Sequence, residues 1–107
     1  MVEYAINLDS VFASLADATR RDILKRVMEK PCSISELAKP YNVSFAAVAK
    51  QVAVLEAALL VFKRREGKQQ IISANPKAID TASEALKQYQ EMWNKRFDAL
   101  EELLEKE

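Results

Sequence analysis

Residues 33–58 read SISELAKPYNVSFAAVAKQVAVLEAA, and this stretch decides how the rest of the chain is interpreted. Ser33 and Glu36 have the spacing of a capping box, in which hydroxyl and carboxylate each bind an otherwise unpaired backbone N–H, so a helix is predicted to follow Ser33. Pro40 is expected to end this helix, because proline disfavours the helical conformation of the residue before it. After a short turn, Ser44 can cap a second helix. The pattern predicts a helix-turn-helix.

The second helix of this unit has two different faces. One face has aliphatic side chains at helical spacing and is predicted to be buried: Val48, Val52, Leu55 and Leu59. The other face is mostly small, with one cation and one amide, and such a face can lie close to another macromolecule, as in a DNA major groove. An ordinary alanine-rich amphipathic helix fits the segment equally well. The candidate DNA-binding residues of this face are Ser44, Phe45, Ala46, Ala47, Lys50 and Gln51.

A β-hairpin is predicted over residues 60–74, directly after the helix-turn-helix. Two runs with strand character flank Glu66-Gly67, which contains the only glycine of the chain. A glycine at the second central position would relieve the positive φ of a two-residue turn. Cations surround the tip, as a wing that straddles a phosphate backbone requires. They are Lys63, Arg64, Arg65 and Lys68.

A long C-terminal helix is predicted over residues 76–105. Asn75 is expected to cap it, with Pro76 at its first position. Apolar residues recur at steps of three and four along a helix of about 45 Å, and a chain this small cannot cover the whole seam, so we expect a second copy to bury part of it. A helix folded back over its own domain would account for about half the seam. The interface residues assigned to this helix are Leu86, Tyr89, Trp93, Phe97 and Leu100.

Two amphipathic helices are predicted before the helix-turn-helix. The first should span about three turns and present Leu8, Val11, Phe12 and Leu15 on one face. Asp17 can cap the second, over residues 18–29. Its predicted buried stripe is Ile23, Leu24, Val27 and Met28, while its cations Arg20, Arg21, Lys25 and Arg26 are expected to remain in solvent.

Charge is unevenly distributed along the chain, although its 107 residues hold 16 basic and 16 acidic side chains. A net charge of zero by itself argues against a nucleic-acid partner. However, residues 40–75 hold five basic and two acidic residues, whereas residues 76–107 hold five basic and eight acidic ones. This asymmetry would orient a single domain of this length on a polyanion.

Histidine is absent and Cys32 is the only cysteine, which excludes a zinc finger, a histidine-dependent catalytic triad and an intrachain disulfide. No phosphate-binding glycine loop is present either, so we expect no enzyme, no metal and no cofactor. Cys32 is interpreted as a small residue flanking a helix, with a redox role as the alternative. Without a signal peptide or membrane-spanning run, we expect a soluble cytoplasmic protein that has no contact with membranes.

Four segments carry a resemblance to a known family. They are LADATRRDIL at residues 15–24, SELA at 35–38, VAKQVAVL at 48–55 and RREGK at 64–68. In these segments, and in the order of its predicted elements, the chain resembles the ArsR-type winged-helix repressors. The resemblance implies a mainly α winged helix-turn-helix fold with a small β-hairpin wing, and a homodimeric transcription regulator whose recognition helix starts at Ser44.

The resemblance also implies that the first and last helices form the dimer interface, so that Leu8, Val11 and Phe12 join the seam residues. Relatives that sense metals use paired cysteines near the recognition helix, or histidines and carboxylates on the last helix. This chain has neither arrangement, and the metal-sensing role is not carried over. It also has Ala49-Lys50-Gln51 where relatives commonly have Ser-Lys-His, and Ala58-Leu59 where they commonly have a glycine.

The leading hypothesis is a dimeric, sequence-specific regulator that binds double-stranded DNA and represses by occupying a promoter, with no effector assigned. Lys50 and Gln51 would enter the groove. Gln51 would pair bidentately with adenine or, alternatively, face a phosphate or solvent. The competing hypothesis is a winged-helix protein-interaction module that no longer reads DNA.

Overall fold

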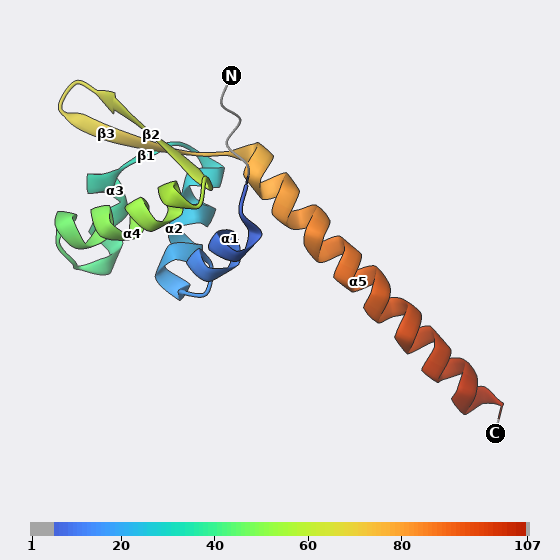
Figure 1. Ribbon diagram of the computed structural model, residues 1–107. Coiled ribbons are helices and arrows are strands. Elements are labelled where there is room, and N and C mark those ends of the chain that lie inside the picture. Colours follow the sequence, from blue (N-terminus) through green and yellow to red (C-terminus); the bar gives the residue numbers. More distant parts are fainter. Residues whose placement is uncertain (1–5, 107) are drawn as a thin grey trace, which may run out of the picture.

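The computed structural model describes residues 6–106 and shows a small helical domain with a β-hairpin, from which one long helix extends (Figure 1). The predicted winged helix-turn-helix with a long C-terminal helix is confirmed. The elements are α1 (Leu8–Ser14), α2 (Ala18–Glu29), β1 (Cys32–Ser33), α3 (Ile34–Ala38), a 3₁₀ helix (Lys39–Tyr41), α4 (Phe45–Ala57), β2 (Val61–Glu66), β3 (Gln69–Ala74) and α5 (Pro76–Glu105).

The predicted capping box starts α3. The Ser33 hydroxyl accepts from the Glu36 N–H at 3.1 Å, and the Glu36 carboxylate accepts from the Ser33 N–H at 3.2 Å. Hydrogen bonding to the Glu36 carboxylate from Ser33, first from its backbone N–H and then from its side chain, lowers the pKa of this carboxyl, because it favours the charged form. Two otherwise unpaired backbone donors are thereby satisfied at the first helix of the helix-turn-helix.

The end of α3 differs from the prediction. The chain does not leave the helical region before Pro40, since Lys39 has φ −50° and ψ −51°, and a 3₁₀ helix continues to Tyr41. Proline is tolerated there because the first positions of a helix need no backbone donor. The turn ends at Asn42, which is left-handed with φ 53°, and Ser44 then caps α4 by accepting from the Ala47 N–H at 3.1 Å.

The core lies between α2, α3, α4 and the sheet. Its fully buried large side chains are Val11, Ile23, Ile34, Leu37, Val48, Val52, Leu55, Leu60, Val61 and Ile72. The sheet has the order β1-β3-β2, with Cys32 paired to Ile72. Strand β1 was not predicted, because two residues are too short for any periodicity to show.

The length of α1 and the burial of Val11 and Met28 differ from the prediction. Helix α1 has 7 residues, about two turns rather than three, because Leu15 is already its C-cap and Asp17 starts α2. Val11 is completely buried in the protomer's own core, which removes it from any dimer interface. Met28 is 54% exposed, because α5 leaves the domain without covering this side of α2.

The hairpin turn and the start of α5 also differ from the prediction. Glu66 pairs with Gln69, so the central turn residues are Gly67 and Lys68, with the glycine first and at φ +63°. A positive φ at the first central residue alone is the pattern of a type II′ turn. Asn75 makes no side-chain cap for α5, because its amide instead donates to the Leu59 carbonyl at 2.8 Å.

Helix α4 ends in a Schellman motif with a leucine at the position that favours glycine. The Leu60 N–H binds the Leu55 carbonyl at 3.0 Å, and the Leu59 N–H binds the Glu56 carbonyl at 2.9 Å. Leu59 has φ 63°, which is costly for a side chain with a Cβ. The departure from the glycine common in relatives is therefore accommodated by a strained backbone rather than by another turn.

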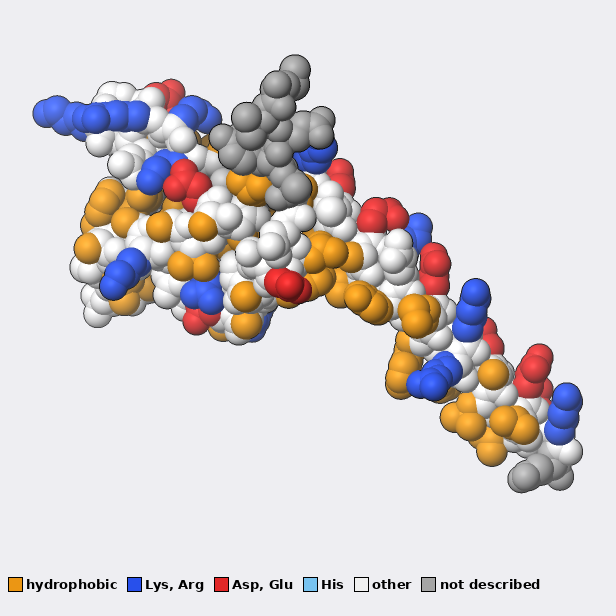
Figure 2. Space-filling view, viewed as in Figure 1, with side chains coloured by type: hydrophobic (Ala, Val, Ile, Leu, Met, Phe, Trp, Pro, Cys, Tyr) orange, Lys and Arg blue, Asp and Glu red, His pale blue; other side chains and the backbone are white. Residues whose placement is uncertain are grey.

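Helix α5 does not fold back over its domain. Only Ala78 and Ala82 are buried along its 30 residues, and the remainder projects away from the domain (Figure 1). Apolar side chains follow one side of the projecting part (Figure 2). Eight of them are more than half exposed: Leu86, Tyr89, Met92, Trp93, Phe97, Leu100, Leu103 and Leu104, which we call the α5 seam.

Candidate nucleic-acid interface

Helix α4 presents a free face beside the wing. Its stripe of Val48, Val52 and Leu55 is buried as predicted, whereas Leu59 lies beyond the helix end and is partly exposed. The helix and the β2–β3 hairpin lie together at the end of the molecule opposite the tip of α5 (Figure 1). Five of the six candidate residues on α4 are exposed: Ser44, Phe45, Ala46, Ala47 and Lys50.

Gln51, the sixth candidate, is half-buried, and its amide oxygen is bound by another residue of the domain. Its Oε1 atom accepts from the Arg20 Nη1 atom at 2.9 Å. Arg20 in turn donates through Nε to the Ser14 carbonyl at 2.6 Å and through Nη2 to the Ala13 carbonyl at 3.4 Å. The expectation that Arg20 remains in solvent is therefore wrong, because its guanidinium joins the end of α1 to α4.

This contact changes what Gln51 can offer a base. Bidentate pairing with adenine needs the glutamine carbonyl to accept from the 6-amino group while its NH₂ donates to N7. The carbonyl already accepts from the Arg20 guanidinium, which leaves its second lone pair and the NH₂ group for a partner. Bidentate pairing with adenine therefore needs the carbonyl to accept from Arg20 and from the 6-amino group at once, whereas the NH₂ group alone can donate to a purine N7, to guanine O6 or to a phosphate oxygen.

Arg26 fixes the turn of the helix-turn-helix to α2. It donates to the carbonyls of Leu37 at 2.9 Å and Glu36 at 3.0 Å, and its guanidinium lies 5.8 Å from the centre of the Tyr41 ring. The Tyr41 hydroxyl donates to the Asp22 carboxylate, and burial followed by this hydrogen bond raises the pKa of Tyr41. Sequence reasoning missed this role of Arg26, because backbone acceptors have no side-chain signature.

The four wing cations are all exposed, as a phosphate contact requires. Lys63 lies 3.6 Å from the Glu56 carboxylate, and Arg64 lies 3.5 Å from that of Glu66. Arg65 donates through Nε to the Gly67 carbonyl at 3.1 Å. Exposed ion pairs of this kind contribute little to stability, so they can exchange for contacts with phosphates.

Cys32 is a buried thiol. It is 4% exposed, and its S–H donates to the Lys30 carbonyl at 3.2 Å. Burial, followed by the nearby Glu36 carboxylate, raises the pKa of Cys32, which keeps it in the unreactive thiol form. Within residues 6–106, no group of three or more His, Cys, Asp or Glu side chains could hold a metal ion. No helix in this part of the chain has the length and apolarity to cross a membrane.

Comparison with known proteins gives several similar regulators. The chain is 29% identical over 99 residues to the HTH-type transcriptional regulator Rv2034 of Mycobacterium tuberculosis, covering 92% of this chain and 90% of that one. It is 37% identical over 76 residues to the uncharacterized HTH-type transcriptional regulator YuzN of Bacillus subtilis, covering 64% of this chain and 83% of that one. No family model matches the chain.

Solved structures agree with these sequence similarities. The ArsR-like transcriptional regulator from Rhodococcus sp. RHA1 is 31% identical and superimposes with a TM-score of 0.72, over 90% of this chain and 91% of that one. The shared fold, the free face of α4 and the exposed basic wing all fit a DNA-binding regulator. The chain therefore belongs to the ArsR-type family of winged helix-turn-helix transcriptional regulators, which are not enzymes.

Proposed function

We propose that the protein is a homodimeric, sequence-specific DNA-binding regulator that represses transcription by occupying a promoter. The exposed face of α4 enters the major groove, and the four wing cations contact phosphates on the flanking backbone. The resemblance to ArsR-type repressors supports repression. We further propose that residues 1–107 form one domain, that the protein acts in the cytoplasm, and that it needs no metal or cofactor.

One observation carries the DNA-binding part of this proposal: α4 and the wing expose their candidate residues on the same end of the molecule. On α4 the first turn is exposed and bears the small side chains of Ala46 and Ala47 beside Phe45, so the helix backbone at the two alanines can approach base edges closely. Lys50 is the cation of this face. The Gln51 NH₂ group beside it is a donor held in place by Arg20.

The dimer is supported by the α5 seam. Its eight side chains expose on the order of 800 Å² of apolar surface per protomer, about what each partner buries in a stable interface. Phe12 and Leu8 of α1 are partly exposed and remain proposed contributors. Two copies related by a two-fold axis would present two recognition helices to two half-sites.

A gel-shift titration of the purified protein against the DNA upstream of its own gene tests this function. We expect a shifted complex that resists unlabelled non-specific competitor and that contains two protomers. Ala46→Glu places a carboxylate on the exposed groove-facing surface of α4 and should abolish the complex, while far-UV circular dichroism stays unchanged. Specific binding that survives Ala46→Glu would mean that α4 is not the reading element.

A second function, a protein-interaction module, is favoured by the surface around α4. Val43 before α4 and Phe45 at its start are exposed apolar residues, and two wing cations are paired with carboxylates. Binding-site selection from random DNA separates the two functions. Enrichment of a defined site supports the regulator, whereas recovery of unselected sequences by a folded dimer supports the interaction module.

A further inference from the structure

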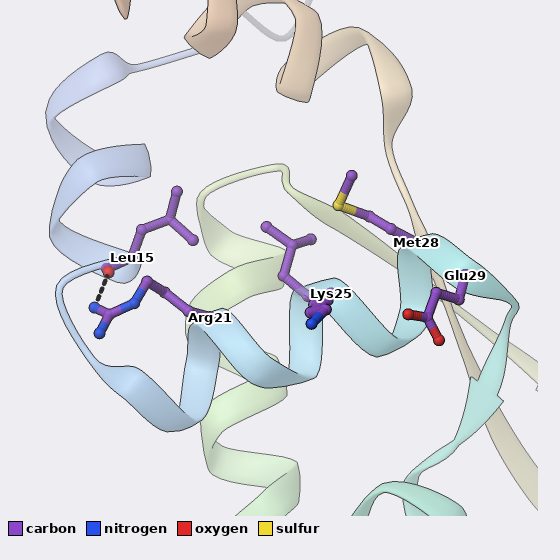
Figure 3. A pocket seen from close by; sticks show the side chains of 6 residues that line it. Leu15, Arg21, Lys25, Met28 and Glu29 are labelled. Carbon is purple, nitrogen blue, oxygen red and sulfur yellow. Dashed lines mark hydrogen bonds between the residues drawn. The ribbon is translucent and has the colours of Figure 1, made fainter.

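A small apolar pocket lies on the side of α2 that α5 leaves uncovered. Its apolar walls are Leu15, Leu24 and Met28, and the side chains of Arg21, Lys25 and Glu29 form its edge. Figure 3 shows Leu15 and Met28 reaching into the space bounded by α1, α2 and the first turns of α5. Met28 is an exposed thioether in this space, where an apolar partner would lower the free energy of the folded protein.

The length of the α5 seam decides which residues lie opposite each other when two copies of α5 pair, and whether one of them can reach this pocket. Ala82 is the last residue of α5 buried against the domain, and Leu104 is the last residue of the seam. The distance between them along the helix is about 33 Å, and Trp93 lies midway. If two α5 helices pair antiparallel about a two-fold axis at Trp93, Leu104 of one copy lies opposite Ala82 of the other, close to the first turns of α5 that bound this space in Figure 3.

The charges favour this antiparallel arrangement. Glu101 and Glu105 flank Leu104 on the last turns of α5, whereas Arg21 and Lys25 lie at the edge of the pocket. Neither cation forms an ion pair within residues 6–106, and Arg21 donates only to the Leu15 carbonyl, at 2.8 Å. A parallel pair would place the distal carboxylates of both copies side by side, where they repel.

We propose that this pocket is the docking site for the distal end of α5 from a second copy of this chain. Leu103 and Leu104 of the second copy pack on Leu15, Leu24 and Met28, while Glu101 and Glu105 of that copy lie beside Arg21 and Lys25. The inference rests on the proposed dimer and adds a specific contact to it. Each α5 then bridges the two domains and sets the spacing between the two recognition helices.

Met28→Glu tests the pocket, because Met28 is exposed, its replacement leaves the core intact, and a carboxylate there would repel Glu101 and Glu105 of the second copy. Sedimentation should show a dimer dissociation constant raised at least tenfold. Val43→Glu is the matched control, since Val43 is 49% exposed but lies in the turn before α4, and it should leave dimerisation unchanged. Equal dissociation constants for Met28→Glu and the wild type would overturn the inference.

Cross-linking tests whether the distal end of α5 from a second copy occupies the pocket. Met28→Cys protein is mixed with Leu104→Cys protein and treated with a short bismaleimide, which should join the two chains rapidly. Glu102→Cys, on the opposite side of α5 by helical spacing, should cross-link to Met28→Cys at least tenfold more slowly. The native Cys32 should not interfere, because it is buried.

A wild-type monomer in sedimentation would overturn both the proposed dimer and this inference. A stable dimer without the Met28–Leu104 cross-link would overturn the inference alone and leave the proposed function standing.

Discussion

Helices α4 and α5 have similar apolar stripes, but the protomer covers only the stripe on α4. Val48, Val52 and Leu55 of α4 are buried by the rest of the domain, whereas Trp93 in the middle of α5 is 67% exposed. Hydrophobic periodicity therefore indicates that a stripe will be covered without indicating which chain covers it. The free surfaces differ accordingly, since α4 exposes mostly small and polar groups, apart from Phe45 and Val54, and α5 exposes a continuous apolar seam that suits a second copy.

The strongest test of this difference compares the stability of the Leu55→Ala and Leu100→Ala variants. Leu55→Ala should lower the free energy of unfolding by about 2–5 kcal/mol at every protein concentration, because it leaves a cavity in the core. Leu100→Ala should lower stability only at concentrations where dimers form. Urea denaturation at two protein concentrations measures both effects. A concentration-independent loss for Leu100→Ala would show that the protomer covers its own seam.

Trp93→Glu should break the proposed dimer. A carboxylate at the centre of the seam is expected to weaken dimerisation by about 2–4 kcal/mol, the range of interface hot spots. Analytical ultracentrifugation gives the dissociation constant, with Gln88→Glu, off the seam by helical spacing, as the control for added charge. If Trp93→Glu stays as dimeric as the control, the interface lies elsewhere.

The Gln51→Ala variant should reveal which DNA group the Gln51 side chain contacts. Loss of one base contact costs about 1–3 kcal/mol at one base pair of each half-site, and selection on random DNA should show relaxed preference only there. The selected base shows whether the Gln51 carbonyl, which binds Arg20, still accepts from the 6-amino group of adenine, the pairing considered from the sequence, or whether the NH₂ group donates to guanine instead. Gln51→Glu is the control that can keep the bond to Arg20 but lacks the donor. Uniform weakening with unchanged preference would assign Gln51 to a phosphate.

Leu59→Gly should stabilise the protein by about 1 kcal/mol, because glycine adopts the left-handed conformation of the α4 end without a Cβ penalty. Ala57→Gly, two residues earlier inside the helix, should destabilise by a similar amount. Thermal unfolding of the two variants compares these opposite signs. A loss of stability for Leu59→Gly would mean that the packing of its side chain outweighs the backbone strain.

Arg65→Ala should have the smallest effect. Removing one phosphate contact flattens the slope of log affinity against log salt by about 0.9, which is about threefold in affinity between 50 and 200 mM salt. The change should be the same for specific and non-specific DNA, since phosphates carry no sequence information. Fluorescence anisotropy across this salt range measures the slope. A slope equal to that of the wild type would remove Arg65 from the backbone contacts.

Local patterns explain which features could be predicted from the sequence. The capping box of Ser33 and Glu36, the buried stripe of α4 and the basic hairpin depend on residues close together in the chain. The type of the hairpin turn was harder, because Gly67 suits either central position and the pairing of Glu66 with Gln69 decides between them. Asn75 was misassigned for a related reason, since its amide satisfies Leu59 across the fold rather than its own helix.

The sequence by itself determined the helix-turn-helix, the wing and the long last helix, because capping, turn chemistry and periodicity act over a few residues, and the resemblance of four short segments indicated the family. Only the tertiary structure decided that Val11 lies in the core, that Met28 lies in an open pocket and that Arg20 holds Gln51. Arg20 and Gln51 are 31 residues apart, and no local pattern links them. Their contact forms because α1, α2 and α4 pack together, and a half-buried polar group then pairs with whichever partner the packing places beside it.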